Sequence, residues 1–398
     1  MISINEAKIK LLEESNRRPK GLLRMNIDNV FGLALGEDLY AKCDSPPFHQ
    51  SAMDGYAINT EAFGKLDNIN LESDVEISAG SNKKIKLNPN TAVRIFTGAK
   101  VPLNCNLVIP QEHVSVDSNN KLQLNASGYS KDDNIRHKGS QFKRGELILE
   151  KGSIMNAAKI AIAVTAGYAQ LKVLKNPKVH IIVCGNELAL PGSKLGAGQI
   201  YESNSVMITA LLKEYNIEIS GSSYSKDSLN QLQNQLKKAF QQSDIVLVSG
   251  GISVGKYDLV QHALANLKTQ TVFYKIKQKP GKPLYFGRNK NKFVFGLPGN
   301  PAATLTCLYE YVLPFIQSLS SVKPANTLPK KAKLLNEYKK KAGLTHFLKA
   351  TVDDNGITIL PDQESYKLTS FAMANCLAII PENASEVKKG EFIEYHLI

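Results

Sequence analysis

The residues DIVLVSGG at positions 244–251 decide the fold class of this chain. An apolar, β-branched run that ends in two glycines is typical of a strand buried on both faces of a parallel sheet. A second run of this kind, VHIIVC at 179–184, ends at Gly185. Ligands of parallel α/β sheets bind at the carboxyl ends of the strands. Because both runs end in glycine, we expect the binding site at that edge.

Further strands and helices alternate along this part of the chain. Short apolar runs predict strands at 217–220, 272–274, 283–287 and 292–296. Helical spacing of apolar residues predicts helices at 203–215, 227–240, 257–267 and 301–318. In the first of these helices, Val206, Leu211 and Leu212 are expected to face the core. Strands that alternate with helices predict a central three-layer α/β domain with a mainly parallel sheet.

The regions on either side of this domain predict β structure. AVRIF (92–96) and NLVIP (106–110) are separated by turn residues, which indicates a β-rich inserted domain. The Pro- and Lys-rich stretch 321–333 reads as a linker. The short β-like runs after it predict a small C-terminal β domain. The fold class is therefore multidomain α/β.

Composition restricts the class of partner. Lys+Arg 49 against Asp+Glu 36 gives a net charge of +13, and seven arginines leave 49 − 7 = 42 lysines. Base edges and phosphates are read mainly by arginine, so this balance argues against a dedicated nucleic-acid reader and fits a phosphorylated small molecule or a solvated surface. No apolar run reaches the ~18 residues of a membrane span. The amino terminus lacks the pattern of a signal peptide, and we expect a cytoplasmic protein with no membrane partner.

The five cysteines are scattered, with no CxxC pair among them. This pattern argues against a disulfide framework and against a zinc finger, and it predicts buried free thiols.

Two glycine-containing segments have the composition of anion sites. SGGISVG (249–255) allows backbone N–H groups to approach an anion at a helix start, although a tight turn explains the glycines equally well. KIKQKPGKP (275–283) places Lys275, Lys279 and Lys282 around a rigid Pro-Gly turn. Clustered ammonium groups repel one another unless an anion lies among them, and the alternative is a solvated basic turn.

Several acids follow strands or lie in unusual loops. Asp54 lies in PPFHQSAMDGYAI (46–58), as a metal or substrate ligand or as a turn former. Glu187, Asp227 and Asp258 lie near the same predicted sheet edge, and helix capping explains one or two of them. Acids together with lysines at one edge favour a Mg²⁺–phosphate site. The turn GLPGNPAAT (296–304) is more simply structural.

Six motifs together resemble one known family. They are QSAMDGYA (50–57), FTGAKVP (96–102), VCGNEL (183–188), SGGISVG (249–255), KPGKP (279–283) and GLPGNP (296–301). In this order and spacing they resemble the MoeA-type molybdopterin molybdenumtransferases, a family that includes the E domain of gephyrin. The resemblance spans almost the whole chain.

The resemblance implies a function and an assembly. The family inserts molybdenum, supplied as molybdate, into adenylylated molybdopterin with release of AMP, and it needs Mg²⁺. Its members are elongated homodimers with a cleft between subunits. The molybdopterin adenylyltransferase and the molybdoenzyme apoproteins are implied as protein partners.

The resemblance also implies four domains. They are an elongated linker domain (1–25 with 43–52 and 141–172), a β-rich inserted domain (53–140), an α/β molybdopterin-binding domain (26–42 with 173–320) and a C-terminal β domain (321–398).

Site residues follow from the positions within the matching motifs. The resemblance assigns catalytic roles to Asp54, Asp258 and Lys279. It assigns substrate binding to Thr97, Glu187, Asp227, Gly250, Gly251, Ser253, Lys275, Lys282, Pro298 and Pro301. It assigns molybdate contacts to Lys279, Lys282, Lys349 and Ser365, and Mg²⁺ contacts to Asp227 and Asp258. Such lysines neutralise a pyrophosphate and an oxyanion, and electrostatic stabilisation supplies most of the rate in this kind of cleavage.

The chain departs from the family pattern at several positions. Ser140 and Gln141 stand where an acid is frequent, Lys256 where an acid or small residue is common, and Glu364-Ser365-Tyr366 replaces a GSG-like segment. Lys349 stands in place of an arginine, and it keeps the charge without the bidentate fork. If Lys349 faces molybdate, the affinity for molybdate is expected to be lower than with arginine.

Two alternatives to an insertase remain at this point. A non-catalytic homologue would act as a scaffold or as a molybdate- or pterin-binding protein, and release of AMP separates it from an enzyme. A nucleic-acid-binding protein would show a steep dependence of affinity on salt.

Overall fold

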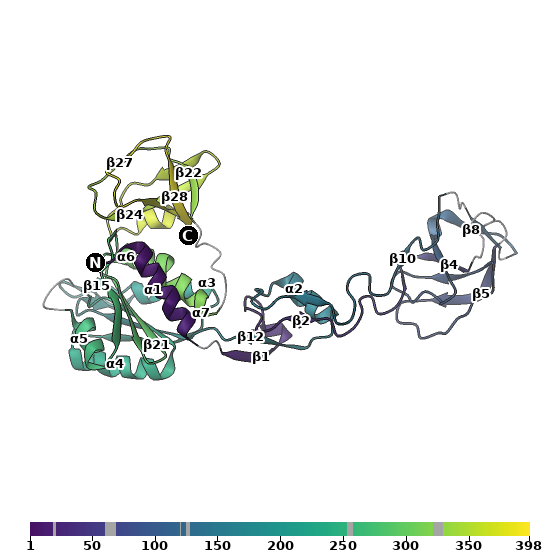
Figure 1. Cartoon of the computed structure of the whole chain (residues 1–398), viewed down its shortest axis with the longest axis horizontal. Coiled ribbons are helices and arrows are strands. Elements are labelled where there is room, and N and C mark those ends of the chain that lie inside the picture. The colour runs from purple at the N-terminus through teal and green to yellow at the C-terminus, as the bar shows by residue number, and fades with distance from the viewer. Residues whose placement is uncertain (19–20, 60–68, 120, 125–127, 253–257, 321–328) are drawn as a thin grey trace. The chain divides into compact units, whose positions relative to one another are not determined.

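The computed structural model describes residues 1–398 except 19–20, 60–68, 120, 125–127, 253–257 and 321–328. Ser253 and Lys256, which the sequence analysis singled out, lie outside the described residues. The chain forms two compact units (Figure 1). The first unit comprises residues 1–23, 32–34 and 174–398, and the second comprises 24–31 and 35–173. Each unit is described by itself.

A six-stranded sheet forms the centre of the first unit. In spatial order its strands are β16 (Ile219–Ser225), β13 (Val179–Cys184), β17 (Ile245–Ser249), β21 (Lys292–Leu297), β20 (Tyr285–Asn289) and β18 (Gln270–Tyr274). The first four strands pair in parallel, and β20 is antiparallel to both of its neighbours. This confirms the mainly parallel sheet. The strand expected at 217–220 instead runs from Ile219 to Ser225. Pairing with β13 extends it through small polar residues, which an apolar pattern does not detect.

Helices cover both faces of this sheet, as the three-layer prediction requires. Ile181 and Leu247 face a core that includes helices α3 (Asn204–Glu214), α6 (Pro301–Cys307) and α7 (Leu313–Leu319). Ile182 and Val246 face a core that includes helices α4 (Leu229–Gln242) and α5 (Leu259–Asn266). Consecutive residues of a strand point to opposite faces, which explains the uninterrupted apolar runs.

One expected core residue of α3 is exposed. Val206 is 61% exposed, whereas Ile208, Leu211 and Leu212 are buried. At ~100° per residue, Val206 lies about 200° around the helix from Ile208. The expectation for Val206 was therefore wrong, and the expectations for Leu211 and Leu212 are confirmed. The long helix expected at 301–318 is present as α6, the π-helical turn η3 (Leu308–Val312) and α7.

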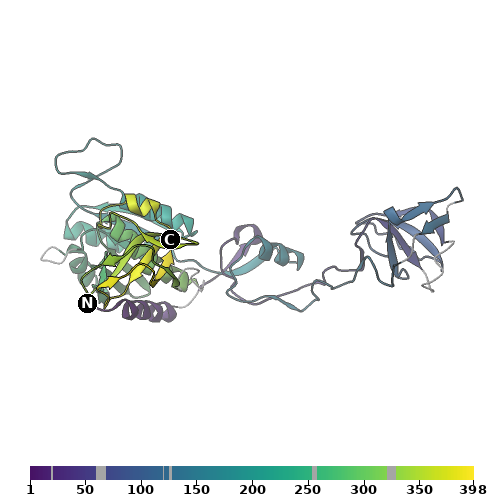
Figure 2. The same ribbon diagram turned by 90° about the horizontal axis from the view of Figure 1, so that it is seen from above.

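The amino-terminal helix belongs to the first unit. Helix α1 (Ile4–Arg17) begins with a capping box in which Ser3 and Glu6 bond each other's backbone N–H groups. Its residues Ala7 and Leu11 are buried in the same core as α7. Figure 2 shows this helix in purple near the N-terminus. This differs from the expected grouping of 1–25 with the linker domain, because the apolar stripe of α1 is covered by the α/β domain.

A smaller sheet forms the C-terminal part of the first unit, as predicted. Its strands are β19 (Gln278–Lys279), β24 (Thr345–Asp353), β26 (Cys376–Ile380), β28 (Phe392–Leu397) and β22 (Lys330–Lys333), with β25 (Gly356–Ile359) paired to β24. Strand β19 comes from the lysine-rich segment that precedes β20 in the chain. It joins the C-terminal sheet by parallel pairing with β24, in a register that places Lys279 opposite His346.

The second unit contains the predicted β-rich inserted domain. Its sheet has the strand order β7 (Leu107–Pro110), β4 (Gly55–Asn59), β6 (Thr91–Ile95), β5 (Ile69–Ile77), β9 (Lys121–Leu124) and β8 (Val114–Val116). Strand β2 (Leu39–Tyr40) pairs with β11 (Leu147–Leu149), and helix α2 (Ala157–Thr165) follows. Residues 35–42 therefore lie in the second unit, which differs from the expected assignment of 26–42 to the α/β domain. The other domain boundaries stay predictions.

The remaining short elements are η1 (Ile27–Asn29), β1 (Leu22–Asn26), β3 (Gln50–Ser51), β10 (Ile135–Arg136), η2 (Gln111–His113), β12 (Gln170–Leu174), β14 (Leu188–Ala189), β15 (Ile200–Tyr201), β23 (Tyr338–Lys339), β27 (Glu386–Val387) and α8 (Thr369–Met373).

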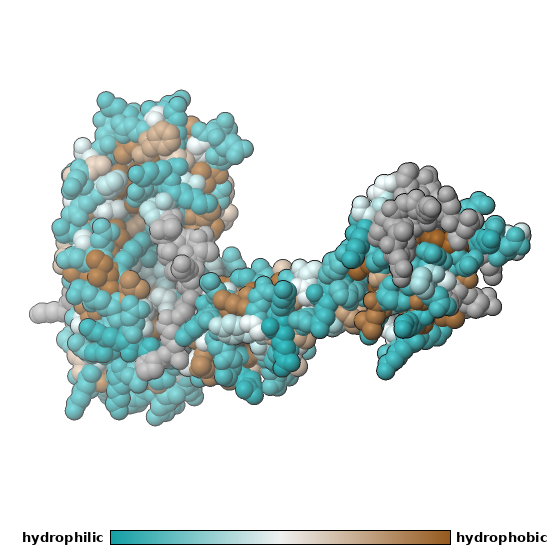
Figure 3. Space-filling model, turned by 45° about the vertical axis from the view of Figure 1, so that its right-hand side comes forward, coloured by the Kyte–Doolittle hydropathy of each residue, from teal (hydrophilic) through white to brown (hydrophobic). Residues whose placement is uncertain are grey.

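One face of the surface is largely hydrophilic, and the cysteines form no disulfide among the described residues. Hydrophilic residues cover much of the face shown in Figure 3, with apolar residues in scattered groups. All five cysteines are free thiols, and Cys184, Cys307 and Cys376 are buried. Within the described part of the chain, none of the helices combines the length and the apolar character that crossing a bilayer requires.

Candidate active site

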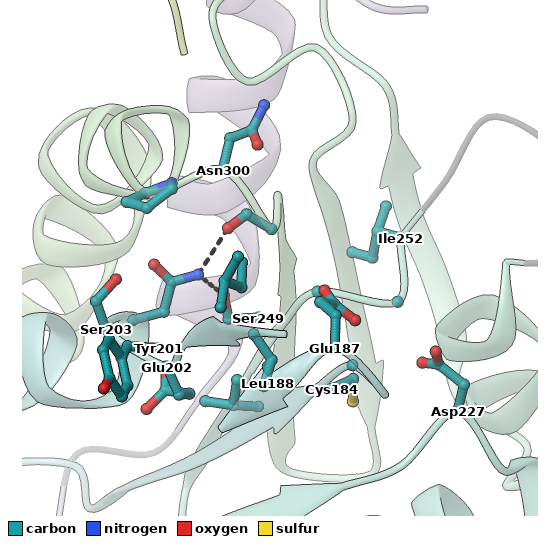
Figure 4. Close-up of a pocket in the computed structure, with 18 of the residues that line it drawn as sticks. Cys184, Glu187, Leu188, Tyr201, Glu202, Ser203, Asp227, Ser249, Ile252 and Asn300 are labelled. Carbon is teal, nitrogen blue, oxygen red and sulfur yellow. Dashed lines mark hydrogen bonds between the residues drawn. The ribbon is translucent and has the colours of Figure 1, made fainter. Parts of the chain in front are cut away.

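A cavity of about 690 Å³ opens at the carboxyl ends of β13 and β17 (Figure 4). Five of the residues assigned by the family resemblance line it, namely Glu187, Asp227, Gly250, Gly251 and Pro301. The glycine-marked edge of the sheet is thus the edge that carries this cavity.

The glycine turn after β17 has a backbone that other residues rarely adopt. Gly250 and Gly251 have φ angles of +82° and +68°. A Cβ atom at Gly250 would clash with the carbonyl oxygen of Cys184 in β13. Glycine is therefore required here both by the dihedral angle and by the close approach of two strands. The turn brings backbone, without side chains, to the cavity wall.

Carboxylates also line the cavity. Glu187 follows β13, and Asp227 lies just before helix α4, with its N–H donating to the side chain of Asn186 at 3.1 Å. Figure 4 shows both carboxylates in the part of the cavity near Cys184. Burial, and then the charges of Glu187 and Asp227, raise the pKa of the neighbouring Tyr224. This end of the cavity is therefore electronegative and suits a cation.

Asn204, at the start of α3, organises the cavity floor. Its side-chain nitrogen donates to Ser249 Oγ at 2.9 Å and to the Gly299 carbonyl at 2.8 Å. Ser249 in turn donates to the Pro298 carbonyl at 3.3 Å. This network fixes the turn before α6. Pro298 is buried within it, and the cavity is lined by Pro301 instead.

A second cavity, of about 480 Å³, is lined by residues of β19 and β24 and by residues 362–366 of the loop that follows β25. Lys279 and Ser365 line it, as the resemblance predicts for residues near an oxyanion. His346 and Tyr338 also line it, and no sequence signal pointed to them. The Tyr338 hydroxyl lies 3.0 Å from His346 Nδ1. Burial, together with the charges of Lys340 and Lys279, lowers the pKa of His346 to about 4, so the imidazole is neutral at pH 7.

The expectation that Lys349 faces molybdate was wrong. Its side chain is buried, and its Nζ donates to the carbonyl oxygens of Asp362 at 2.5 Å, Lys367 at 3.1 Å and Glu364 at 3.3 Å. Three ammonium hydrogens are matched by three backbone acceptors. Burial lowers the pKa of Lys349. Lys349 therefore fixes the loop 360–368, and the tertiary fold directs it inward from β24.

This loop connects the two cavities. The Ser365 carbonyl accepts from the N–H of Ala302 at 3.2 Å, and Ser365 Oγ accepts from the side chain of Asn300 at 2.8 Å. Both partners lie at the start of α6. The adjacent residue, Tyr366, lines both cavities.

Of the three expected lysines, Lys279 reaches a cavity. Lys275 has a φ of +67°, and its Nζ lies 4.8 Å from the centre of the Tyr274 ring. Lys282 is exposed beside Gly281, where a Cβ would lie 2.6 Å from Cys307 Sγ. The Pro-Gly turn is thus packed tightly against α6. Among the described lining residues of the two cavities, neither Lys275 nor Lys282 appears.

Asp258 acts as a buried helix cap. One carboxylate oxygen accepts from the Gln261 N–H at 3.0 Å, and the other accepts from the Tyr274 hydroxyl at 2.6 Å. Burial, and then Asp258, raise the pKa of Tyr274. Asp258 is 5% exposed and is absent from the described lining of both cavities. The capping explanation of this acid is the one that the geometry supports.

The fit of Mg²⁺ differs between the two expected ligands. Asp258 is buried, is absent from the described lining of both cavities and directs both carboxylate oxygens at protein donors, so it does not fit a metal ligand here. Asp227 lines the open cavity and does fit. Among the residues that the structure describes, no three His, Cys, Asp or Glu side chains gather as a metal site. Mg²⁺ in phosphate-binding enzymes commonly uses one or two carboxylates plus substrate oxygens and water.

Asp54 and Thr97 contact each other in the second unit. Asp54 Oδ1 accepts from the Thr97 N–H at 2.7 Å and from its hydroxyl at 2.6 Å. These two bonds hold the pKa of Asp54 below its usual range. The two motifs QSAMDGYA and FTGAKVP are therefore adjacent in space. In the same unit, Gln141 accepts a hydrogen bond from the Ser45 hydroxyl at 2.8 Å.

Family descriptions match three regions of the chain. Residues 2–167 match the "MoeA N-terminal region (domain I and II)", residues 180–318 the "Probable molybdopterin binding domain", and residues 331–398 the "MoeA C-terminal region (domain IV)". Together these regions cover nearly all of the chain.

Individual relatives are similar to this chain along nearly its full length. The chain is 31% identical over 400 residues to the molybdopterin molybdenumtransferase of Staphylococcus epidermidis and 30% identical to that of Staphylococcus aureus, covering 99% of this chain and 94% of each relative. Two crystal structures of the molybdopterin biosynthesis protein MoeA from Pyrococcus horikoshii are similar to it. Their TM-scores are 0.83 and 0.81 at 28% and 25% identity, with 100% of this chain and at least 99% of each structure covered. The chain therefore belongs to the MoeA family of molybdopterin molybdenumtransferases.

Proposed function

We propose that this protein inserts molybdenum from molybdate into adenylylated molybdopterin, with release of AMP and with Mg²⁺ as cofactor. Membership of the family supports the general reaction. The observation that carries the specific proposal is the pair of cavities joined by the loop 360–368, because the reaction needs a nucleotide site and an oxyanion site next to each other.

The larger cavity is assigned to the pterin nucleotide. Its volume of about 690 Å³ lies within the ~300–1,000 Å³ typical of sites for small molecules. Backbone at Gly250 and Gly251 can approach phosphate oxygens without hindrance from side chains. Mg²⁺ held by Asp227, with Glu187 nearby, would supply positive charge to those phosphates.

The smaller cavity is assigned to molybdate. Lys279 supplies the positive charge. Since Ser365 Oγ accepts from Asn300, its hydroxyl hydrogen can be directed at the oxyanion. In the tautomer in which the Tyr338 hydroxyl donates to Nδ1 of His346, Nε2–H is a further neutral donor. Hydrogen bonds to an ionised acceptor are about twice as strong as neutral ones.

The residues of this chain act by binding and by charge stabilisation. Lys279 reaches the smaller cavity from a turn whose backbone is packed against α6, so its charge is positioned before the substrate binds. Lys282 is exposed on the same turn and adds positive charge near it. Positive charge beside the bond that releases AMP stabilises the negative charge that develops there. The network of Asn204 and Ser249 keeps the wall of the nucleotide cavity in place.

The remaining expectations complete the proposal. Asp54 and Thr97 act as a pair that contributes to catalysis and binding. The protein works as a cytoplasmic homodimer. It receives its substrate from the molybdopterin adenylyltransferase and passes its product to molybdoenzyme apoproteins. The non-catalytic alternative drew on the altered C-terminal positions, which are Lys349 and residues 364–366. Because Lys349 is buried under the loop 360–368, its replacement of an arginine gives the alternative no support.

The test is an insertion assay with the full chain, adenylylated molybdopterin, molybdate and Mg²⁺, in which AMP is measured. We expect release of AMP that depends on molybdate. Lys279→Ala should weaken binding of molybdate roughly ten- to a hundredfold, since a charge-assisted bond contributes ~1.5–3 kcal/mol. Lys389→Ala, which removes an exposed lysine of the C-terminal β domain, is the matched control. Binding of the substrate without any release of AMP would identify a binding protein instead.

A further inference from the structure

One aromatic side chain is shared by the two cavities. Tyr366 lines the cavity at the glycine turn and also the cavity beside Lys279. It is 63% exposed. An exposed ring at the junction of two ligand sites is available to whatever fills them.

The backbone that carries this ring is fixed from both sides. On the side of the C-terminal sheet, Lys349 donates to the carbonyl oxygens of Asp362, Glu364 and Lys367. Gln363 adds a bond to the Lys349 carbonyl at 2.9 Å. The loop therefore has a defined shape even though it carries no helix or strand between 360 and 368.

On the side of the α/β domain, the residue next to the ring is attached to helix α6. Ser365 accepts from the Ala302 N–H at 3.2 Å and from Asn300 at 2.8 Å. Asn300 itself lines the larger cavity (Figure 4). Because this backbone is fixed, only the side-chain torsions of the ring remain to be ordered when a ligand covers it.

The chemistry of an exposed phenol ring selects one class of ligand. An aromatic face stacks on a flat heteroaromatic ring, and such stacking on a base contributes ~1–3 kcal/mol. The proposed substrate carries flat rings in both its pterin and its adenine part. Molybdate has no flat face, so its contact with the tyrosine would be limited to the ring edge and hydroxyl.

We propose that Tyr366 is a specificity-determining residue that stacks on a flat ring of the pterin nucleotide and couples the occupancy of the two cavities. This inference rests on the proposed function and deepens it. When one ligand orders the ring, the second ligand binds a wall that is already in place, which makes binding of the two cooperative. Coupling of this kind is reciprocal between the two ligands.

The test is an equilibrium titration without Mg²⁺, so that turnover does not intervene. The affinity for adenylylated molybdopterin is measured with and without molybdate for the wild type, Tyr366→Ala, Tyr366→Leu and Tyr366→Phe. We expect molybdate to tighten nucleotide binding in the wild type and in Tyr366→Phe. In the Ala and Leu variants we expect about tenfold weaker nucleotide binding and loss of that coupling. Molybdate alone should bind all four proteins within about twofold.

Phe392→Ala provides the matched control. Phe392 is 72% exposed in the C-terminal sheet and is absent from the described lining of both cavities, so this change should alter neither affinity nor coupling. If the wild type binds neither ligand, the proposed function fails and this inference fails with it. If the wild type binds both ligands but Tyr366→Ala keeps its nucleotide affinity and its coupling, or if Tyr366→Leu behaves as Tyr366→Phe, only the inference about a stacking ring is overturned.

Discussion

The ammonium group of Lys349 lies 2.5 Å from the carbonyl oxygen of Asp362, and it donates to two more carbonyls of the same loop. The sequence resemblance places Lys349 at the oxyanion, whereas these contacts make it an anchor of the loop 360–368. A lysine can satisfy three convergent backbone acceptors with a compact charge, whereas the planar fork of arginine suits a carboxylate or an oxyanion. The residue thus supports the site indirectly.

The first prediction concerns this loop anchor. Lys349→Met removes the charge and leaves three carbonyl oxygens without their donor, so we expect the free energy of unfolding to fall by about 2–4 kcal/mol. Urea denaturation measures the change. Lys367→Met is the matched control, because Lys367 is partly exposed and pairs with the Asp362 side chain at the surface. Its effect should stay below about 1 kcal/mol. Equal effects of the two variants would contradict the anchoring role.

The second prediction separates capping from catalysis at Asp258. Asp258→Asn keeps an oxygen for the Gln261 N–H but weakens the contact with Tyr274, so we expect a loss of about 1 kcal/mol in stability. Asp258→Ala should cost more, because it removes both contacts. Release of AMP per folded molecule should be retained in Asp258→Asn.

Energetic coupling between Asp258 and Tyr274 provides the check on this prediction. In a double-mutant cycle, Tyr274→Phe and Asp258→Ala should be non-additive, since they share a 2.6 Å hydrogen bond. A large loss of turnover in Asp258→Asn with unchanged folding would restore a catalytic role for this acid.

The third prediction concerns a buried acid in the π-helical turn. Glu310 is 2% exposed and contacts Lys8 at 2.9 Å and His396 at 2.7 Å. Burial alone would raise its pKa, but Lys8 and His396 together hold the pKa below the usual 4.5. Because the pKa is lower in the folded state, its contribution to stability is complete above pH 4.5 and is lost as the pH falls through the folded pKa.

The variant for this prediction is Glu310→Gln. At pH 7 we expect a loss of about 3 kcal/mol, since breaking a buried pair leaves its partners uncompensated. Denaturation measured between pH 7 and pH 3 should show a smaller dependence on pH than in the wild type. Glu394→Gln, which removes an exposed carboxylate 3.7 Å from Lys331, is the control and should change stability by less than about 1 kcal/mol.

The fourth prediction concerns His346 in the smaller cavity. Its pKa is about 4 in the folded protein, below the 6.5 of a free histidine, because burial and the charges of Lys340 and Lys279 disfavour the charged ring. The unfolded chain therefore binds a proton between pH 6.5 and pH 4 that the folded chain does not, and stability falls as the pH is lowered through this window. His346→Gln should reduce that fall. Chemical-shift titration of the His346 ring provides the direct measurement, and a midpoint near 6.5 would contradict the prediction.

The sequence by itself determined the fold class and the edge of the sheet that carries the larger cavity. The strands β13 and β17 were predictable because side chains buried on both faces must be apolar without interruption, and this requirement is local. The turn after β17 was equally predictable, since Gly250 and Gly251 adopt backbone angles that other residues rarely adopt. Six motifs in register were enough to indicate the family.

Tertiary structure decided which polar residues meet. His346 and Tyr338 carry no motif, and they reach the smaller cavity because β24 pairs with β19 in a register that places His346 opposite Lys279. Lys349, three residues further along β24, points to the interior of the loop 360–368 instead. Successive side chains of a strand alternate between faces, so neighbours in sequence are sent to different environments. Residue type fixes what a side chain can do, but the pairing of distant strands fixes what it contacts.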